Sequence, residues 1–490
     1  MIGPTEPVEQ HPDSQWYSIE WRSVERRVKN LRQRIFRATS NGQWNKVRSL
    51  MKLMLRSYSN LLLSVRKATQ ENKGKRTPGI DQRLALTPKS RMKLVREMLE
   101  LKSWRVKPAI RLYIPKANGK LRPLGILTIK NRTAQAMMKN ALEPSWEARF
   151  ESHSYGFRPG RATHDAIEQC FKRFQSRGLD CWVLDADIKG AFDNISHSFI
   201  LEKLGEIPGK ALIKQWLKAG YVEAEINHAT DAGVQQGGVI SPVIANVALD
   251  GIQELLGSKF GFVRYTDDFV VTGRSKESIE AIKPVIEKWL AERGLTLNVE
   301  KTRIASIQNG FDFLGFNIRR YQGKCLIKPQ KEKVILFLQE ISKWLKSHPT
   351  VKAEVVIDHL NPILRGWAQY YRYAVSSKTF SYVQSCLWGM LWRWCKRRHA
   401  NKNSAWTKRK YFRAHDGREW SFFATVADGS AKYLISIKRI VIQRHRKVAG
   451  SASPDNPELR KYWQERAERK HRSSLEQQSV SATVRTLLEA

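Results

Sequence analysis

Disulfide, membrane-spanning and secretory features are absent from this 490-residue sequence. No run of about 18 apolar residues occurs, and residues 1–20 lack the basic region and apolar core of a signal peptide. The cysteines are odd in number, widely spaced and free of any C-x-x-C pair, so we expect reduced core thiols and no zinc or redox site. They are Cys170, Cys181, Cys325, Cys386 and Cys395. These absences predict a cytoplasmic protein that has no membrane partner.

Acidic residues are scarce, because 46 Asp and Glu face 86 Lys and Arg and leave a net charge of +40. The excess is concentrated in two segments. Residues 21–80 contain 16 basic and 2 acidic side chains, and residues 391–450 contain 16 basic and 3 acidic side chains. A polyanion relieves self-repulsion of this size, since each phosphate contact releases counterions. A membrane surface is the weaker alternative, because no basic helix has a strong apolar stripe. The charge pattern therefore favours nucleic acid.

Hydrophobic spacing predicts an α+β chain. Apolar residues recur at helical intervals from Trp21 to about Gln70, and Thr87-Pro88 begins a further helix that runs to about 101. The segment 112–126 predicts a basic hairpin around Asn118-Gly119. We also expect a buried strand over 181–187, two strands over 262–271, and helices near 161–177, 241–256 and 275–293. Beyond Pro329 the pattern changes to amphipathic helices that are rich in Trp and Tyr.

Three aspartates carry the chemistry that we predict. Asp187 ends an apolar strand, and Asp267 and Asp268 occupy a turn between two apolar strands. Buried carboxylates need a compensating cation, and Mg²⁺ prefers oxygen ligands and substrate phosphates. Phosphoryl transfer by two metal ions uses such a set. By itself, an Asp pair in a turn is more often structural, because Asp suits turns.

Several motifs in order resemble those of group II intron reverse transcriptases. They are Leu184-Asp-Ala-Asp-Ile-Lys-Gly-Ala-Phe-Asp193, Tyr265-Thr-Asp-Asp268, Gln236-Gly-Gly-Val-Ile-Ser-Pro242, His153-Ser-Tyr-Gly-Phe-Arg-Pro-Gly160 and Phe313-Leu-Gly-Phe316. Downstream, Leu364-Arg-Gly-Trp-Ala-Gln-Tyr-Tyr371 is similar to the maturase domain of that family, and 396–450 to its DNA-binding domain. The resemblance covers nearly the whole chain. It implies an RNA-directed DNA polymerase that binds its intron RNA, assists splicing and copies the intron during retrohoming.

The resemblance also implies roles for individual residues. Two Mg²⁺ ions would be held by Asp187, Asp267, Asp268 and the carbonyl of Ile188, with Lys301 as proton donor to pyrophosphate. The dNTP substrates would contact Lys116, Arg122, Ile188, Phe192, Gln236 and Gly237, where Phe192 rejects a 2′-hydroxyl. The primer grip would be Phe313, Leu314, Gly315 and Phe316. Intron RNA, target DNA and primer–template would contact Arg26, Arg27, Arg34, Lys75, Arg76, Trp367, Tyr371, Arg397, Arg398, Lys408, Arg409 and Lys410. Phe192 as plain core, and Lys301 as an ordinary surface lysine, stay open.

The implied fold is a right-hand polymerase with an antiparallel palm sheet, a helical N-terminal extension, a helical thumb and a small basic DNA-binding domain. The expected parts are a basic RNA-binding extension (1–80), reverse transcriptase fingers and palm (81–328), a maturase or thumb domain (329–395), a DNA-binding domain (396–450) and a flexible endonuclease remnant that packs little (451–490).

Three departures from the family pattern stand out. Thr266 replaces the usual Ala, Gln235 replaces a frequent Pro, and no Cys follows Cys395 to build a zinc-dependent endonuclease. We therefore expect no endonuclease activity, and priming from an existing 3′ end. Two alternatives remain: a splicing-only maturase whose polymerase site is a relic, and another prokaryotic reverse transcriptase of the retron or CRISPR-associated kind.

Overall fold

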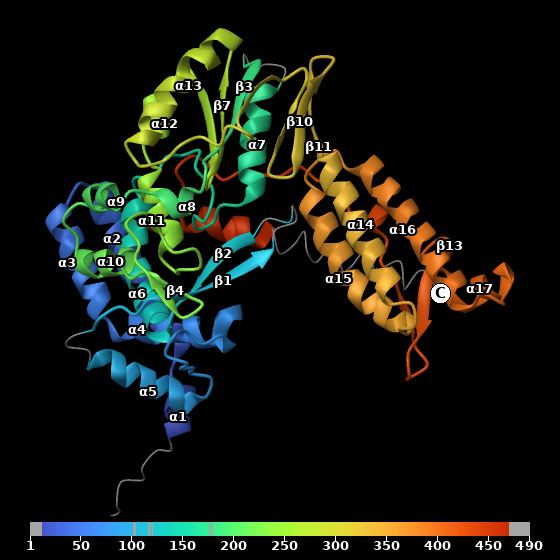
Figure 1. Ribbon diagram of the computed structural model, residues 1–490, viewed down its shortest axis with the longest axis horizontal. Coiled ribbons are helices and arrows are strands. Elements are labelled where there is room, and N and C mark those ends of the chain that lie inside the picture. The colour runs from blue at the N-terminus through green and yellow to red at the C-terminus, as the bar shows by residue number, and fades with distance from the viewer. Residues whose placement is uncertain are drawn as a thin grey trace, which may run out of the picture.

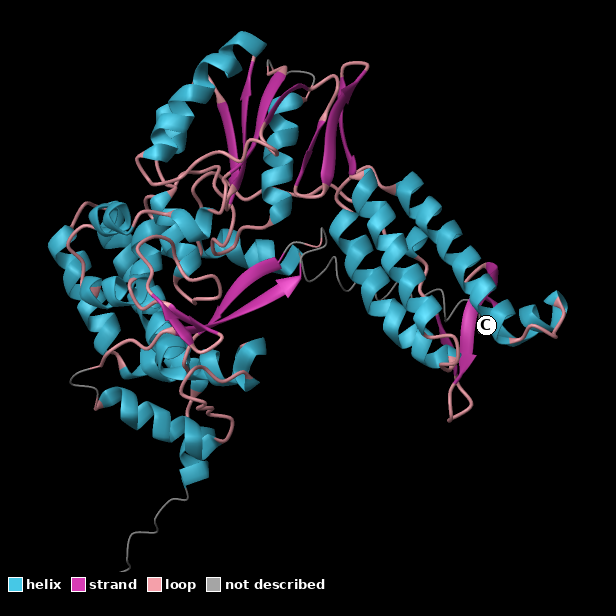
Figure 2. Cartoon of the chain, viewed as in Figure 1, coloured by secondary structure: helices cyan, strands magenta, loops and turns pink. Residues whose placement is uncertain are grey.

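The structure is a computed structural model that describes residues 12–100, 104–115, 119, 121–175, 178 and 180–469. Helices and mostly antiparallel sheets alternate along the chain, which confirms the α+β expectation (Figure 2). A large body built from the N-terminal half is joined through β10 and β11 to a separate bundle of long helices (Figure 1). Within the described residues, no helix combines the length and apolarity needed to cross a membrane.

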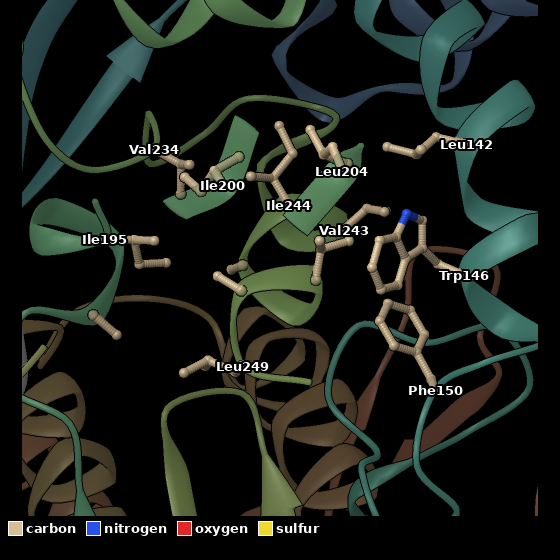
Figure 3. Packing of buried hydrophobic residues seen from close by; sticks show 14 of the residues in the cluster. Leu142, Trp146, Phe150, Ile195, Ile200, Leu204, Val234, Val243, Ile244 and Leu249 are labelled. Atoms are coloured by element: carbon tan, nitrogen blue, oxygen red, sulfur yellow. The ribbon is translucent and has the colours of Figure 1, made fainter. Parts of the chain in front are cut away.

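The N-terminal helices form one side of the body. Their bounds are α1 Pro12–Tyr17, α2 Trp21–Ser40, α3 Trp44–Arg56, α4 Tyr58–Arg66 and α5 Pro88–Leu99. The predicted helical period is confirmed, because α2 buries Val24, Val28 and Ile35 on one face. The start of α5 is confirmed as well, since Thr87 and Ser90 cap it reciprocally. Helices α2, α3 and α4 pack on α6 (Ile129–Glu147), and Figure 3 shows Trp146 of α6 beside Val243 of α11 (Ser241–Ala248).

A four-stranded sheet, in the order β2-β1-β4-β5, projects from this body. Its strands are β1 Ala109–Pro115, β2 Leu121–Ile126, β4 Tyr221–Glu223 and β5 Ile226–His228. The β1–β2 pair is the predicted basic hairpin, with Ile114 opposite Arg122. β1 pairs with β4 in parallel, so this sheet is not purely antiparallel.

The central sheet has the order β6-β7-β3-β8 and is antiparallel throughout. Its strands are β3 Trp182–Asp187, β6 Gly261–Tyr265, β7 Asp268–Gly273 and β8 Arg303–Ser306, as the sequence predicts for the first three. Val183 and Leu184 are both fully buried and lie in different core clusters, so both faces of the sheet are covered. α13 (Lys276–Ala291) covers one face, and α7 (Thr163–Phe174) contacts β6 (Figure 1). The remaining short helices of this region are α8 Ala191–Asn194, α9 His197–Leu204, α10 Lys210–Leu217 and α12 Ile252–Leu256.

The C-terminal half begins with a small sheet and continues as the helical bundle. The sheet has the order β11-β10-β9. Its strands are β9 Phe311–Phe313, β10 Phe316–Tyr321 and β11 Lys324–Pro329, and the long helices are α14 Lys331–Ser347, α15 Ala353–Tyr371 and α16 Ser377–Arg398. A last unit consists of α17 Ser404–Tyr411, β12 Phe412–His415, β13 Arg418–Thr425 and β14 Ala431–Tyr433. None of the five cysteines, all of which lie within the described residues, forms a disulfide, and Cys170, Cys325 and Cys395 are buried as expected.

The segment after residue 450 packs closely, so the expectation of a flexible remnant is wrong for residues 451–469. Few apolar residues occur there, but polar anchors replace them. Asp455 accepts two hydrogen bonds from Arg32 of α2, at 2.8 and 2.6 Å, and Arg466 donates to the fully buried Asp165 of α7. The indole of Trp463 lies so close to Gly160 that a Cβ there would clash at 2.5 Å. Residues 470–490 lie outside the described residues.

Replacing Arg32 with Met is expected to destabilise the folded protein by about 3 to 5 kcal/mol. Arg32 also pairs with Glu143 at 2.9 Å, and the side chains of Glu143 and Asp455 are only 6% and 7% exposed. Without Arg32, Asp455 would stay buried with no ion-pair partner among the described residues, and Glu143 would keep only Lys139, at 3.4 Å. Urea unfolding curves measure the change. Arg34→Met, an exposed position on the same helix, is the matched control and should leave the midpoint unchanged. Equal midpoints for the two variants would contradict the anchoring role of Arg32.

Candidate active site

Strand register brings the predicted carboxylates together. Asp187 is the last residue of β3 and lies directly opposite Asp268, the first residue of β7. Asp267 precedes Asp268 in the turn that joins β6 to β7, and its carbonyl accepts a hydrogen bond from the Ile188 amide at 3.3 Å. Residues 80 positions apart in the chain therefore share one end of the central sheet.

The turn itself has an unusual backbone. Thr266 has a φ of +64°, a left-handed conformation that β-branched residues rarely adopt. Gly156 packs against it so tightly that a Cβ on Gly156 would lie 2.5 Å from the Thr266 nitrogen. Such strain persists only where the surroundings hold it in place, and it is common at functional sites. The effect of Thr266 in place of Ala stays a prediction.

Burial and mutual repulsion raise the pKa values of two of these carboxyls. Burial is the largest cause for Asp268, followed by the charge of Asp267 and by the hydrogen bond and charge of Asp187, and together they raise its pKa to about 7. The pKa of Asp267 is raised by burial and then by the charge of Asp187. Within the described residues, neither Asp267 nor Asp268 has a salt-bridge partner. A bound cation would reverse both shifts.

Asp187 differs from these two because it has polar partners. Its Oδ2 atom lies 2.9 Å from Nζ of Lys301, and its Oδ1 atom accepts a hydrogen bond from the Asn298 amide group at 3.1 Å. Burial opposes charging of Lys301, but the hydrogen bond and charge of Asp187 outweigh it and raise the pKa of this ammonium group. Lys301 therefore stays protonated, as a proton donor requires. Asn298 escaped the sequence prediction, because one Asn in a polar loop carries no signal.

A fourth aspartate, Asp185, lies on the same face of β3 two residues earlier. Burial raises its pKa to about 6, although the charge of Arg303 opposes this shift. Nε of Arg303 lies 3.0 Å from its carboxylate. Asp185 thus forms an ion pair with Arg303, whereas Asp267 and Asp268 have no ion-pair partner among the described residues.

The donor set suits Mg²⁺, which takes carboxylate oxygens. Asp187, Asp267 and Asp268 supply oxygen ligands only, and two of them are uncompensated. Among the residues that the structure describes, no group of three or more acidic, His or Cys side chains forms a complete ion-binding cluster. The contacts of Asp187 with Lys301 and Asn298 provide a physical reason, because its carboxylate is engaged by these two side chains. The assignment of these residues as metal ligands, with the carbonyl of Ile188, stays a prediction.

The predicted nucleotide pocket is only partly assembled around these carboxylates. Phe192 of α8 is half-buried, so its gate role and its core role both stay open. Phe157 meets it edge to face, with ring centroids 6.3 Å apart. Phe157 is 54% exposed and has a φ of +58°. An exposed aromatic residue in a strained conformation beside the site is a functional candidate that hydrophobic spacing could not reveal.

Gln236 and Gly237 form a loop that lies on the basic hairpin. The amide group of Gln236 donates to both carboxylate oxygens of Asp193, at 3.2 and 3.0 Å. Gly237 has a φ of +105°, and a Cβ there would lie 2.8 Å from the Gly125 carbonyl. Arg122 is exposed on β2 and acts electrostatically on Asp267. Lys116 lies outside the described residues.

The predicted primer grip is the turn between β9 and β10. Phe313 and Phe316 are buried, so only the backbone of Leu314 and Gly315 lies at the turn. Helix α15 holds that backbone, because the hydroxyls of Tyr370 and Tyr371 donate to the carbonyls of Leu314 and Gly315, at 2.7 and 3.2 Å. A primer role for this turn stays a prediction.

Tyr371 is a correction to the predicted nucleic-acid contacts. It is 5% exposed and its hydroxyl is used by Gly315, so its ring has no free face for a base. Trp367 is half-buried and stacks on Phe337, with centroids 4.7 Å apart.

Of the predicted basic contacts, the exposed ones are Arg26, Arg27, Arg34, Arg76, Arg397, Arg409 and Lys410. Those that are half-buried and already hold carbonyls or rings are Lys75, Arg398 and Lys408.

Comparison with known protein families agrees with this site. Residues 114–318 match the family described as reverse transcriptase (RNA-dependent DNA polymerase). Residues 16–98 match the N-terminal domain of reverse transcriptase, and residues 335–412 match the maturase-specific domain of group II introns. The first match contains all three aspartates. The fold and the site thus define a reverse transcriptase with the right-hand polymerase fold.

Individual relatives narrow the family further. Protein YkfC of Escherichia coli (strain K12) is 31% identical over 318 residues, which are 54% of this chain and 81% of that protein. Group II intron-encoded protein LtrA of Lactococcus lactis subsp. cremoris is 29% identical over 320 residues, which are 51% of this chain and 53% of LtrA. This chain thus spans about half the length of LtrA. It belongs to the group II intron reverse transcriptase and maturase family.

One solved structure extends the comparison. Telomerase from Candida albicans was solved in complex with a TWJ fragment of telomeric RNA. Its alignment with this protein covers 65% of this chain and 68% of the telomerase chain. The TM-score is 0.37 and the identity 12%, a likeness from which no conclusion is drawn.

Raising the pH from 6 to 8 is expected to lower the thermal midpoint of the metal-free protein and to increase the stabilisation that Mg²⁺ gives. The folded-state pKa of Asp268, about 7, exceeds the ordinary value of 3.8. The stability linked to that proton is complete below the unfolded pKa and is lost as the pH rises through about 7. Mg²⁺ competes with the proton. Thermal unfolding at both pH values, with and without Mg²⁺, measures the two effects.

Asp268→Asn should remove most of both effects and raise the metal-free midpoint at pH 8. Asp428→Asn, which changes an exposed carboxylate in a loop, is the control and should behave like the unchanged protein. An Mg²⁺ response that is the same in Asp268→Asn and in the unchanged protein would contradict the placement of Asp268 at a cation site.

Proposed function

We propose that this protein is an RNA-directed DNA polymerase and intron maturase. It binds a group II intron RNA, assists its splicing and reverse-transcribes the intron during retrohoming. The observation that carries the proposal is the register of β3 and β7, which sets Asp187 opposite Asp268 beside Asp267 in a chain with this family membership. A nucleotidyltransferase that uses dNTP substrates and two Mg²⁺ ions fits such a carboxylate set.

Each residue of the site has a proposed part in the reaction. Asp187, Asp267 and Asp268 would hold the two ions, which when bound would supply activation of the primer 3′-hydroxyl and charge stabilisation of the leaving pyrophosphate. Lys301 is protonated and lies 2.9 Å from Asp187, so it can give a proton to the leaving group from within the site. Arg122 can bind the triphosphate bidentately.

The other residues of the pocket select the substrate. Phe192, five residues after Asp187 in the chain, is the proposed gate whose bulky ring excludes a 2′-hydroxyl by contact. Gln236 is oriented by Asp193, and Gly237 allows the backbone to approach closely. The turn at Leu314 and Gly315 supports the primer end through its backbone.

The nucleic-acid partners fit the two basic blocks. The exposed arginines of α2, Arg26, Arg27 and Arg34, contact intron RNA through its phosphates. Trp388 of α16 and Trp420 of β13 are 39% and 37% exposed and meet edge to face, and Lys408 of α17 lies over the Trp420 ring. Exposed Trp beside Lys and Arg suits target DNA and primer–template. We assign 1–80 to RNA binding, 81–328 to fingers and palm, 329–395 to the thumb and 396–450 to DNA binding.

Primer extension on an RNA template with Mg²⁺ tests the polymerase proposal. Asp187→Asn is expected to lower kcat by about 1,000-fold or more, because it removes a metal ligand. Asp185→Asn is the matched control, since Asp185 lies on the same strand and face but has Arg303 as its partner. It should keep activity within about threefold, because Arg303 is half-exposed and water can solvate it.

The same variants separate the polymerase from the splicing-only maturase. Asp187→Asn should assist splicing of the intron RNA as well as the unchanged protein does, because RNA binding uses other residues. An unchanged protein without primer extension but with splicing activity would establish the splicing-only alternative. Equal extension by Asp187→Asn and Asp185→Asn would refute the site. Absence of endonuclease activity stays a prediction.

Replacing Arg26, Arg27 and Arg34 together with Gln is expected to weaken intron RNA binding and to make it less dependent on salt. Each lost phosphate contact reduces the slope of log K against log salt by about 0.7 to 0.9, so three contacts reduce it by about 2. Filter binding across a salt series gives the slope. The control replaces Lys276, Lys283 and Lys288 of α13, where Lys276 and Lys283 pair with neighbouring glutamates, and it removes the same charge. Equal slopes for the two triple variants would contradict an RNA-binding arm.

A further inference from the structure

A buried arginine lies directly beneath the turn that carries two of the aspartates. Arg264 is in β6, three residues before Asp267, and is 1% exposed. Burying a guanidinium group is costly unless its hydrogen bonds are satisfied. Yet two of its nitrogens, Nε and Nη2, have no hydrogen-bond partner within the described residues. The fold thus buries the charged Arg264 side chain beneath the turn, although its burial costs free energy.

The remaining nitrogen of Arg264 reaches the turn itself. Nη1 donates to the carbonyl of Thr266 at 3.3 Å and to Oδ1 of Asn246 at 3.0 Å. Thr266 is the residue with the left-handed backbone. Its carbonyl points into the interior, where water cannot satisfy it. Among the described residues, Arg264 alone donates a side-chain hydrogen bond to this carbonyl.

The surroundings hold the guanidinium group in place. Asn246 on α11 is 2% exposed and donates to the Gly156 carbonyl at 2.9 Å, and Gly156 packs on Thr266. On the other side, Glu151 lies 3.9 Å from Nη2 and accepts hydrogen bonds from the Gly251 and Gln253 amides. The backbone of Arg264 pairs with His153 and Tyr155. One network therefore joins the loop before α7, helix α11 and the turn.

Fold stability alone does not account for this network. Apolar residues of similar size often replace a buried ionic group without loss of stability, and β6 already has its full ladder to β7. An apolar side chain cannot hold the Thr266 carbonyl, and it cannot attract the Asp267 carboxylate, on which Arg264 acts electrostatically. Both effects act on the position of the catalytic turn.

We propose that Arg264 is a positioning residue that fixes the Tyr265–Asp268 turn through the Thr266 carbonyl. It contacts no substrate and acts through Asp267 and Asp268. The proposal rests on the polymerase function proposed above, and it explains how a β-branched residue is held in a left-handed conformation at this point. Lysine cannot replace Arg264 fully, because its single ammonium group cannot span Thr266, Asn246 and Glu151 as the guanidinium fork does.

The test compares Arg264→Met and Arg264→Lys in the full-length protein. Arg264→Met is expected to lower kcat of primer extension by about 100-fold, because displacement of about 1 Å has effects of this size. The KM for dNTP and the Kd for primer–template should stay within about threefold, because the lost interaction acts on the chemical step. Arg264→Lys should recover about tenfold of the loss, since it keeps the charge and one donor.

The matched control is Arg293→Met. Arg293 is a second buried arginine of the same body, 5% exposed, and it donates to the carbonyls of Ala248 and Trp289 at 3.0 and 2.6 Å, away from the turn. The Arg293→Met variant should be less stable than the unchanged protein, but it should not show the selective loss of kcat expected for Arg264→Met. Should Arg264→Met not fold, the double variant Arg264→Met, Glu151→Gln removes both buried charges and takes its place.

Two readouts separate this proposal from the polymerase proposal. Amide hydrogen exchange in a peptide that covers residues 262–271 should be faster by about tenfold or more in Arg264→Met and unchanged in Arg293→Met, whether or not the protein extends a primer. Absence of extension by the unchanged protein would refute the polymerase proposal alone. Unchanged exchange of that peptide, or a kcat loss that higher Mg²⁺ fully restores, would overturn the positioning role of Arg264.

Discussion

The antiparallel register of β3 and β7 is the constraint on which the site depends. It sets Asp187 opposite Asp268 and leaves Asp267 in the adjoining turn. A slip of one residue would turn every side chain of β3 to the other face. Because both faces of this sheet are buried by different core clusters, such a slip would disrupt two cores at once. The packing of Val183 and Leu184 thus secures the position of a carboxylate four and three residues away.

Charge is distributed in this protein so that the carboxylates remain uncompensated. The chain carries a net charge of +40, yet Asp267 and Asp268 have no ion pair among the described residues. The cations nearest to the site are committed elsewhere: Arg303 to Asp185, and Arg264 to the Thr266 carbonyl. Among the described residues, Lys301 is the only cation that forms an ion pair with a proposed metal ligand, Asp187. This arrangement keeps carboxylate oxygens for cations and leaves the basic blocks for phosphates.

Much of the fold could be predicted from local patterns. The helices from Trp21 onwards and the hairpin at β1 and β2 follow from period and turn residues, which act over a few positions. The tail after residue 450 could not be predicted in this way, because its contacts with Arg32 and Asp165 join positions about 420 and 300 apart. Low apolar content therefore did not predict weak packing here. Buried ion pairs and one Trp anchor the segment in place of apolar side chains.

The candidate site shows the same division. Motif order indicated which family the chain belongs to and predicted which aspartates carry the proposed chemistry, since residue types in sequence carry that information. Tertiary structure decided which neighbouring side chains contact the residues of the site: Asn298 bonds to Asp187, Phe157 packs on Phe192, and Arg264 bonds to the Thr266 carbonyl. These side chains have no local pattern, because their roles come from partners on other strands and loops. The sequence by itself thus determined the family of this protein and the residues of its proposed chemistry, and only the packing of distant segments decided the geometry that supports them, because partners far apart in the chain leave no local pattern.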